Sequence, residues 1–456
     1  MGFRLELETT AARAVGKLSR AARKGGGTTL PGKLLWKVDP RAVDALAARL
    51  AQGVLLVSAT NGKTTTTAMA AQILGRDRHL VWNRAGANLM SGIGSALLSA
   101  ADAELGLFEV DEAALPEAIA RTRPRSVLLG NLFRDQLDRY GELELVAERW
   151  RSSIAELPAA TSLVVNADDA VVCDVADGRE NVLRFGIDDH RHARATLQHA
   201  ADSKYCVRCG TPYEYAAAYV GHLGDYRCPE CGHARPKLDV AAREVEFRGL
   251  WASRFTLVTP EASTEIELAL PGLYNVYNAV AAASLASSVG ASLEQIRAGI
   301  EAFSAAFGRF ERIGAGGKTV VLLLVKNPAG ANEVLRTLEL GGVPPVLVIA
   351  LNDAIADGQD VSWIWDVDFE PLLERVGRVV ATGGRAEELG LRLLYGGLTE
   401  DRLEVRPSLE EALDRGLELT ESRAELVVLP TYTAMLGLQS IVAERGHAER
   451  YWERTR

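Results

Sequence analysis

The fold is decided by residues 54–67, Val54-Leu55-Leu56-Val57-Ser58-Ala59-Thr60-Asn61-Gly62-Lys63-Thr64-Thr65-Thr66-Thr67. The apolar run Val54–Val57 predicts a buried strand, and residues 68–74 predict a helix. A tight turn between a strand and a helix directs backbone N–H groups and the helix dipole at a bound anion. The junction Gly62-Lys63-Thr64 therefore indicates a phosphate-binding loop, in which Lys63 contacts the β- and γ-phosphates and the Thr64 hydroxyl holds Mg²⁺.

This loop is a shortened form of the common nucleotide-binding pattern. The full pattern has a glycine five residues before Gly62, and Val57 stands there. A Gly-Lys turn that binds nothing is the alternative, and the strand before it and the helix after it favour the phosphate loop.

Composition and charge describe an ordinary globular protein. At 456 residues the chain has room for two or three domains, and 48% of its residues are hydrophobic and 24% charged. The net charge of −9 argues against a general nucleic-acid binder, which needs a basic face. The sequence shows neither an apolar run long enough to span a bilayer nor a signal peptide, so we expect a cytoplasmic protein with at most peripheral membrane contact.

The cysteines indicate a metal site. Four of the five form two pairs, Cys206-x2-Cys209 and Cys228-x2-Cys231, and this spacing is typical of a structural zinc bound by four thiolates. Redox or accidental pairing is the alternative. We place a zinc-ribbon insertion at residues 203–236, and we interpret Cys173 as a small packed hydrophobe.

Strand and helix patterns alternate along most of the chain, which predicts an α/β fold with parallel sheets covered on both faces. Residues 1–41 form a basic helical segment, interpreted as a solvated helix face, with contact to anionic lipid as the alternative. Residues 42–313 form a central ATP-binding domain, and residues 314–456 form a second, C-terminal α/β domain. The expected strands are Val54–Val57, Leu105–Val110, Ser126–Leu129, Ser162–Val165, Thr319–Val325, Val346–Leu351, Val379–Thr382 and Leu426–Leu429.

Phosphate chemistry also needs carboxylates for the metal ion. Residues 108–112, Phe-Glu-Val-Asp-Glu, place three acids at the end of a predicted strand, where parallel sheets bind ligands. Glu109 is the best magnesium ligand among them; surface acids at a strand end are the alternative.

Together these stretches resemble the Mur ligase superfamily. Further similar stretches are Asn166-Ala167-Asp168-Asp169, Pro271-Gly272-Leu273-Tyr274-Asn275-Val276-Tyr277-Asn278 and Lys326-Asn327-Pro328-Ala329-Gly330. The resemblance implies a Mur ligase-like central ATPase domain, a Rossmann-like C-terminal domain, and ATP and Mg²⁺ as cofactors. It implies that the nucleotide is bound by Thr60, Asn61, Gly62, Lys63, Thr64, Thr65, Asn275, Asn278, Lys326 and Asn327.

Where the sequence departs from that pattern, it resembles the MurT branch of the superfamily. Ligases that add an amino acid have a UDP-sugar-binding domain where this chain has residues 1–41, and a metal-binding histidine where it has Gln136. They also carry a carbamylated lysine in the central domain, but this chain has no lysine between Lys63 and Lys204. The ribbon and the stretch Asp357-Gly358-Gln359-Asp360-Val361-Ser362-Trp363-Ile364-Trp365-Asp366 resemble MurT. That resemblance implies ATP-dependent amidation of the D-Glu α-carboxyl of the lipid II stem peptide to D-isoglutamine, at the inner face of the membrane. It also implies that ammonia comes from a GatD-like glutaminase, whose Cys–His pair Asp360 completes.

The cysteine inventory supports a separate glutaminase. A glutaminase needs a cysteine activated by a histidine. Four cysteines are committed to metal, and Cys173 has no histidine near it in sequence. Trp363, Ile364 and Trp365 lie in an otherwise polar loop, as interface hot spots do. With the role that the resemblance implies for Asp360, the predicted catalytic residues are Lys63, Glu109 and Asp360. Two alternatives stay open: a Mur- or folylpolyglutamate-type ligase that adds an amino acid, and a non-catalytic zinc-ribbon nucleotide-binding protein.

Overall fold

The computed structural model describes residues 29–84, 86–100, 102–135, 143–194, 196–198, 201–303 and 310–446. The helix predicted near the N-terminus lies mostly outside these residues; within residues 1–41 the structure describes α2 (Leu30–Val38). Gln136 also lies outside them. Within the described ranges, no helix is both long and apolar enough to cross a membrane.

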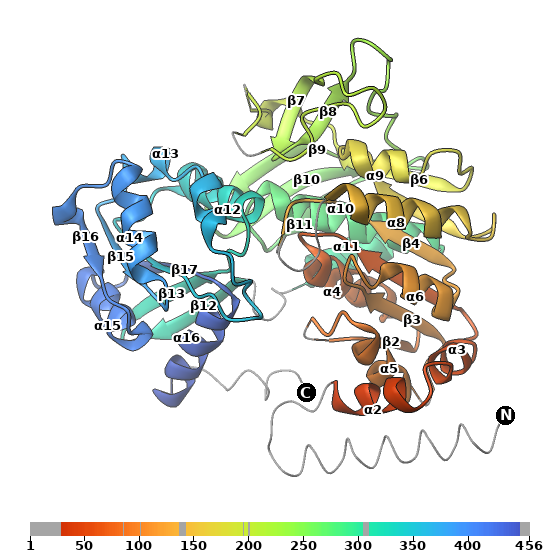
Figure 1. Ribbon diagram of the computed structural model, residues 1–456, viewed down its shortest axis with the longest axis horizontal. Helices are drawn as coiled ribbons and strands as arrows, with labels where there is room; N and C mark the ends of the chain where they lie inside the picture. The colour runs from red at the N-terminus through yellow and green to blue at the C-terminus, as the bar shows by residue number, and fades with distance from the viewer. Residues whose placement is uncertain are drawn as a thin grey trace.

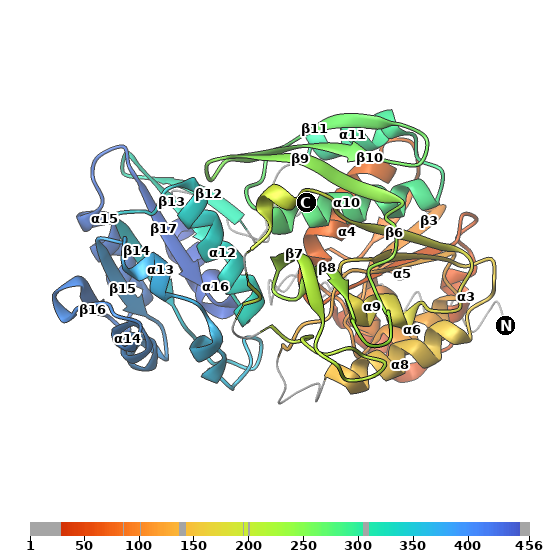
Figure 2. The same ribbon diagram turned by 90° about the horizontal axis from the view of Figure 1, so that it is seen from above.

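The first sheet has nine strands in the order β11-β10-β9-β6-β5-β4-β1-β3-β2 (Figures 1 and 2). Strands β2 to β6 and β1 run parallel, β9 is parallel to β6, and β10 and β11 complete an antiparallel edge. The strands are β1 (Val54–Ser58), β2 (Leu80–Trp82), β3 (Leu105–Glu109), β4 (Ser126–Leu129), β5 (Ser162–Asn166), β6 (Val182–Ile187), β9 (Val240–Arg248), β10 (Ala252–Val258) and β11 (Ser263–Leu268).

Alternating side chains of β1 face two different cores, because successive residues of a strand point to opposite faces. Leu55 and Val57 pack into the core that also holds Met69, whereas Val54 and Leu56 pack into the core of Trp150. Helices α4 (Lys63–Leu74), α10 (Leu273–Ser288) and α11 (Leu293–Glu301) contribute to the first core. The second is built from α2, α3 (Ala42–Ala47), α5 (Met90–Ser99), α6 (Leu115–Thr122), α8 (Leu143–Ala155) and α9 (Ala170–Val175).

The cysteine-rich insertion stands between β6 and β9. Its antiparallel pair, β7 (Glu214–Val220) and β8 (Leu223–Arg227), forms a separate two-stranded sheet at the top of Figure 1. The predicted small insertion is thus present as a hairpin with the cysteines beside it.

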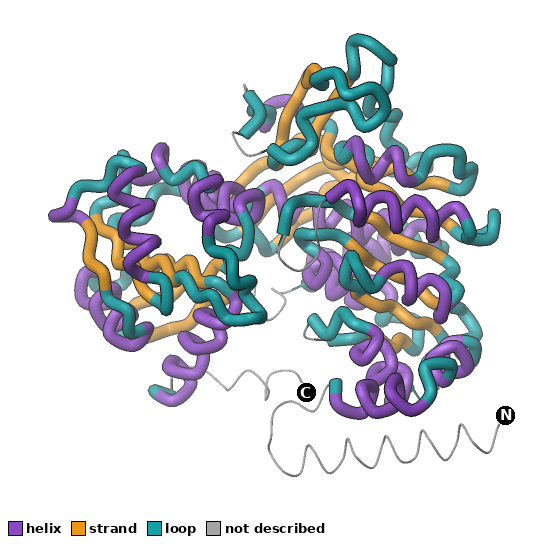
Figure 3. Tube along the Cα trace, viewed as in Figure 1, coloured by secondary structure: helices purple, strands orange, loops and turns teal. Residues whose placement is uncertain are grey.

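The second sheet has six strands in the order β12-β13-β17-β14-β15-β16, and it lies apart from the first sheet (Figure 3). Only β12 is antiparallel to its neighbour. Its strands are β12 (Phe310–Ala315), β13 (Lys318–Leu323), β14 (Val346–Ala350), β15 (Arg378–Thr382), β16 (Leu403–Val405) and β17 (Glu425–Pro430). Its α-helices are α12 (Pro328–Gly341), α13 (Glu370–Leu373), α14 (Ala386–Tyr395), α15 (Leu409–Leu419) and α16 (Tyr432–Glu444).

The expected strands are confirmed, and no end differs from its expected position by more than two residues. The expected domain boundary at residues 313–314 falls inside β12, so the second sheet begins at Phe310. Gly316 and Gly317 have φ of 58° and 81° and form the two-residue turn of the β12–β13 hairpin. Such turns favour glycine, so the chain at this boundary forms a hairpin within the second sheet.

Candidate active site

The predicted phosphate loop follows β1 and ends at α4. Gly62 adopts φ 85° directly before the helix, and Lys63 is the first helical residue, five residues earlier than the sequence suggests. A Cβ atom on Gly62 would lie 2.0 Å from Asn278 Oδ1. Gly62 has no side chain to cap the helix, so backbone N–H groups of the first turn of α4 are left for an anion.

Lys63 is held by a carboxylate that the sequence analysis did not assign. Its Nζ atom lies 2.6 Å from Glu112 Oε2, and both side chains are buried. Burial by itself lowers the pKa of Lys63, but the charges of Glu112, Glu109 and Asp111 outweigh it and raise that pKa above its ordinary value. Burial likewise opposes ionisation of Glu112, and the Lys63 and Lys326 charges outweigh it and lower the pKa of this carboxyl. Both groups are therefore charged at neutral pH.

The two predicted magnesium ligands are in contact. The Thr64 hydroxyl donates to Glu109 Oε1 at 3.1 Å. The Glu109 backbone is fixed by Asn83, whose amide accepts from Glu109 N and donates to Glu109 O, each at 2.8 Å. A hydroxyl and a carboxylate oxygen beside a phosphate loop are the hard donors that Mg²⁺ takes, so the residues fit this ion.

A second loop, which follows β4, supports the phosphate loop. Asn131 accepts from Asn61 N at 2.8 Å and donates to Asn61 O at 3.0 Å. Phe133 N donates to Thr60 Oγ1 at 3.0 Å, and that hydroxyl donates back to Phe133 O at 3.3 Å. Thr60 and Asn61 of the phosphate loop are thus both hydrogen-bonded to the loop that follows β4.

The C-terminal domain reaches the same loop. Lys326 Nζ donates to Thr60 O at 3.1 Å and pairs with Asp135. The amides of Asn327 and Asn61 donate to each other at 3.0 and 3.3 Å. Lys326 and Asn327 therefore lie beside the phosphate loop, as the sequence predicts.

A cleft lies between the two domains, lined by Asn61 and Gly62 on one side and by Lys326 and Gly330 on the other. Asn275 and Asn278 of α10 line it, and they are joined by a 3.2 Å hydrogen bond between their amides. Its other lining side chains are mostly apolar or aromatic and include Phe133, Val220, Leu223, Leu270, Tyr274, Tyr277, Phe310 and Leu324. The cleft thus has polar side chains at the phosphate loop and a mostly apolar lining elsewhere, with Glu333 as a further polar residue.

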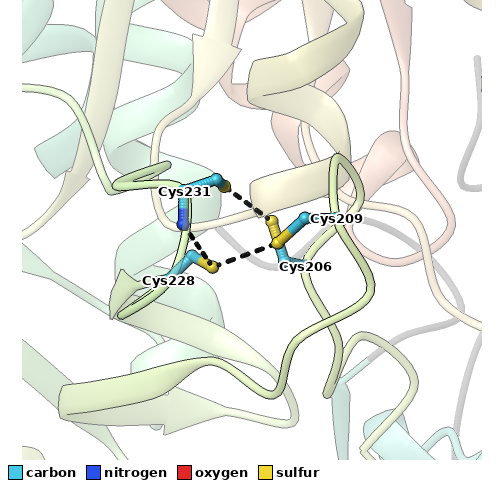
Figure 4. A group of neighbouring side chains, drawn as sticks. All are labelled: Cys206, Cys209, Cys228 and Cys231. Carbon is cyan, nitrogen blue, oxygen red and sulfur yellow. Dashed lines mark hydrogen bonds between the residues drawn. The ribbon is translucent and has the colours of Figure 1, made fainter.

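The four cysteines of the insertion face one another (Figure 4). Their sulfur atoms all lie within 4.8 Å, with 3.5 Å between Cys206 and Cys231 and 3.4 Å between Cys209 and Cys228. Four thiolates at about 2.3 Å from one zinc are about 3.8 Å apart, so the arrangement fits that metal. Backbone N–H groups of Arg208 and Cys231 donate to Cys206 and Cys228, respectively.

Asp360 lies outside the cleft, on an exposed loop before the short helix η2 (Ser362–Asp366). Its Oδ1 accepts from Ser362 N at 2.8 Å, and hydrogen bonds from Ser362 lower its pKa. Of the apolar trio predicted as an interface, Trp365 is 49% exposed but Ile364 is 2% exposed, because Ile364 packs into the domain core. Trp363 also packs against this core.

Asp360 lies outside the cleft, which six of the predicted nucleotide residues line: Asn61, Gly62, Thr65, Asn275, Asn278 and Lys326. Sequence reasoning missed Glu112, Asn83, Asn131 and Asp135 as partners of the loop residues. Their place after the parallel strands was the available signal, since loops at the carboxyl ends of parallel strands meet at one edge.

Comparisons with known proteins agree with this architecture. Residues 57–228 match the family model of the Mur ligase middle domain, and residues 324–435 match that of the MurT ligase C-terminal domain. A Streptococcus pneumoniae protein named lipid II isoglutaminyl synthase (glutamine-hydrolyzing) subunit MurT is 32% identical, over 97% of this chain and 98% of its own length.

Solved structures share the fold. A pseudomurein peptide ligase type C from Methanothermus fervidus has a TM-score of 0.71 at 21% identity, covering 88% of this chain and 80% of that one. A MurF ligase from Thermotoga maritima in complex with ADP has a TM-score of 0.64 at 12% identity, covering 92% of this chain and 85% of that one.

Proposed function

Because the chain belongs to the MurT family of Mur ligases, we propose that it is the ATP-dependent synthetase subunit of a lipid II isoglutaminyl synthase. The reaction converts the α-carboxyl of D-glutamate in the lipid II stem peptide into a primary amide, giving D-isoglutamine. Glutamine supplies the ammonia through a partner subunit. The lipid-linked substrate brings the reaction to the inner face of the membrane.

The observation that carries the proposal is the convergence of Lys63, Thr64 and Glu109 at the phosphate loop, whose residues Gly62 and Thr65 line the interdomain cleft. Mur ligases use ATP and Mg²⁺, and these three side chains are a cation and two oxygen donors beside a helix N-terminus. Thr64 and Glu109 would hold Mg²⁺, which when bound offsets the charge of the phosphates. Asn275, Asn278, Lys326 and Asn327 would contact the rest of the nucleotide.

The first chemical step transfers the γ-phosphoryl group to a carboxylate oxygen of the substrate. A new P–O bond forms, the bond to the bridging oxygen of ADP breaks, and an acyl phosphate results. Lys63 stabilises the charge that moves between the phosphate oxygens. Its raised pKa keeps it protonated at neutral pH, and Glu112 holds it beside the loop.

In the second step ammonia attacks the acyl carbon. The C–N bond forms, phosphate leaves with the former carboxylate oxygen, and the nitrogen loses a proton to give the amide. Each amide that forms consumes one ATP and one ammonia.

We further propose that a GatD-like glutamine amidotransferase subunit docks on the C-terminal domain. Asp360 is exposed, and its lowered pKa keeps it ionised, as a residue that orients a histidine of the partner must be. Apolar side chains are exposed on the same domain: Ile355 at 82%, Trp365 at 49% and Tyr395 at 75%. The rings of Trp365 and Tyr395 lie 5.7 Å apart. Aromatic side chains of this kind anchor protein interfaces.

The four cysteines would bind a structural zinc ion. Their sulfur separations fit a tetrahedral site. Zinc bound there would close the base of the insertion and stabilise its fold.

Phosphate release tests the proposed function. The chain is combined with the glutaminase, glutamine, Mg·ATP and a muramyl peptide with a free D-Glu α-carboxyl. We expect phosphate release that requires both the peptide and glutamine or ammonium. Release that ignores the peptide contradicts the proposal, and release that requires an amino acid in place of ammonia supports an amino-acid-adding ligase instead.

A further inference from the structure

The cysteine insertion reaches into the interdomain cleft. The tip of its hairpin, Val220-Gly221-His222-Leu223, joins β7 to β8, and Val220 and Leu223 line the same cleft as Gly62 and Lys326. Both are buried, with 6% and 2% of their surface exposed. Because they are apolar, they suit the nucleoside end of a bound nucleotide rather than its phosphates.

The tip is packed against the loop that supports the phosphate loop. Gly221 has φ 57°, and a Cβ atom there would lie 2.7 Å from the Phe133 ring. The His222 ring centroid lies 4.7 Å from that of Phe133. Since Phe133 is hydrogen-bonded to Thr60 through its backbone, the tip, Phe133 and the phosphate loop form one continuous set of contacts.

The tip also contacts the second domain. Arg336 of α12 donates to Tyr219 O at 2.8 Å, next to Val220. Figure 2 shows α12 on the side of the C-terminal domain that faces β7. The hairpin tip is therefore held by both walls of the cleft.

The other end of the hairpin is built on the cysteines. Cys228 follows the last residue of β8, and Cys206 and Cys228 pack with Tyr213 and Tyr226 in a small core. A two-stranded sheet by itself is marginally stable in water. The five residues of β8 span about 17 Å. A metal bound at the base of the hairpin would therefore not touch the tip, but it can hold the hairpin so that the tip stays in the cleft.

We propose that Val220 and Leu223 form a wall of the nucleoside pocket, and that metal binding by the four cysteines holds this wall in place. The inference rests on the proposed nucleotide site and gives the insertion a role in ATP binding beyond its own folding. Val220 and Leu223 are binding residues, and the cysteines are positioning residues.

Calorimetric titration of the full chain with Mg·ATP and with Mg·tripolyphosphate tests the wall. Val220→Ala is expected to raise the Kd for Mg·ATP about fifteenfold, since contact with about two methyl-sized groups is lost. It should leave the Kd for tripolyphosphate unchanged. Val207→Ala makes the same truncation at an exposed site of the insertion, and it should change neither.

Unchanged Mg·ATP affinity in a Val220→Ala protein that unfolds at the wild-type temperature overturns the inference. An equal loss of tripolyphosphate affinity also overturns it, because the wall would then act on the phosphates. Should Val220→Ala fail to fold, the Kd values of Leu223→Ala for Mg·ATP and Mg·tripolyphosphate are measured instead, with the same outcomes expected.

The metal is tested by Cys209→Ser, which changes an exposed ligand of the cluster, against Cys173→Ser, which changes a thiol outside it. Cys209→Ser is expected to lower the bound zinc measured by mass spectrometry and to weaken Mg·ATP binding, and Cys173→Ser to do neither. Loss of zinc with wild-type ATP affinity would overturn this part. A wild-type chain that binds no ATP would contradict the proposed function itself, whereas ATP binding insensitive to these changes contradicts only the inference.

Discussion

Replacing Glu112 with alanine should destabilise the central domain, because it leaves a buried ammonium without its nearest partner. Lys63 Nζ and Glu112 Oε2 are 2.6 Å apart, and their side chains are 7% and 9% exposed. Removing one member of a buried ion pair typically costs about 3–5 kcal/mol. Glu109 and Asp111 also favour the charged form of Lys63, so we expect a loss near 3 kcal/mol, the lower end of that range, for Glu112→Ala.

Replacing both partners should cost less than replacing Glu112 alone. In the double variant Lys63→Met with Glu112→Leu, neither member of the pair is left behind as a buried charge without its partner, and apolar side chains fill a similar volume. Urea unfolding followed by tryptophan fluorescence measures these differences. Trp150 is a suitable reporter, since its buried indole N–H donates to Glu112 O at 2.9 Å.

The pH dependence follows from the two pKa shifts. The pKa of Glu112 is lowered from 4.5. Its contribution to the free energy of unfolding is therefore present above pH 4.5 and is lost as pH falls through the folded-state pKa. The pKa of Lys63 is raised from 10.5, so its contribution is present below that value and is lost as pH rises through the folded-state pKa. The difference in free energy of unfolding between wild type and Glu112→Ala should be largest between these two pH limits. A loss below about 1 kcal/mol at neutral pH, or a double variant less stable than Glu112→Ala, would refute the reasoning.

Three further changes test the site. Gly62→Ala should weaken Mg·ATP binding more than about tenfold in a calorimetric titration, because its Cβ would lie 2.0 Å from Asn278 Oδ1 at a left-handed φ; wild-type affinity would show that the loop tolerates the change. Thr64→Val keeps the shape but removes the hydroxyl that contacts Glu109, so Mg²⁺ should strengthen ATP binding less than in wild type, and an unchanged Mg²⁺ effect would remove Thr64 from the metal site. Asp360→Asn should leave ATP affinity and ammonium-dependent amidation intact while reducing glutamine-dependent amidation; equal loss with both nitrogen sources would exclude the proposed role of Asp360.

Local pattern was sufficient to predict the core of the site. A strand, a glycine turn and a helix are adjacent in sequence, so the sequence alone predicts that Lys63 and Thr64 lie at a phosphate-binding end. Glu109 followed because parallel strands end at the same edge of a sheet, and the structure brings it to Thr64. The cysteine cluster was predictable for a similar reason, since two short spacings each bring a pair of thiols together.

Contacts across long separations were not predictable from such patterns. Glu112 was visible as an acid at a strand end, but only the fold determines that it and not Asp111 pairs with Lys63. Nothing in the sequence around Val220 shows that a hairpin tip lies in the cleft. Ile364 was assigned to an interface because it stands between two tryptophans in an otherwise polar loop, whereas the turn of η2 directs it into the core.

The measurement that tests the central claim most directly is the fate of oxygen-18 placed in the D-Glu α-carboxyl of the muramyl peptide. The chain, its glutaminase partner, glutamine and Mg·ATP convert this peptide to its amide, and the released phosphate is analysed by mass spectrometry. If the cleft activates the carboxylate as an acyl phosphate, each amide formed is accompanied by one phosphate that carries the label. Amide formed with unlabelled phosphate would contradict the account.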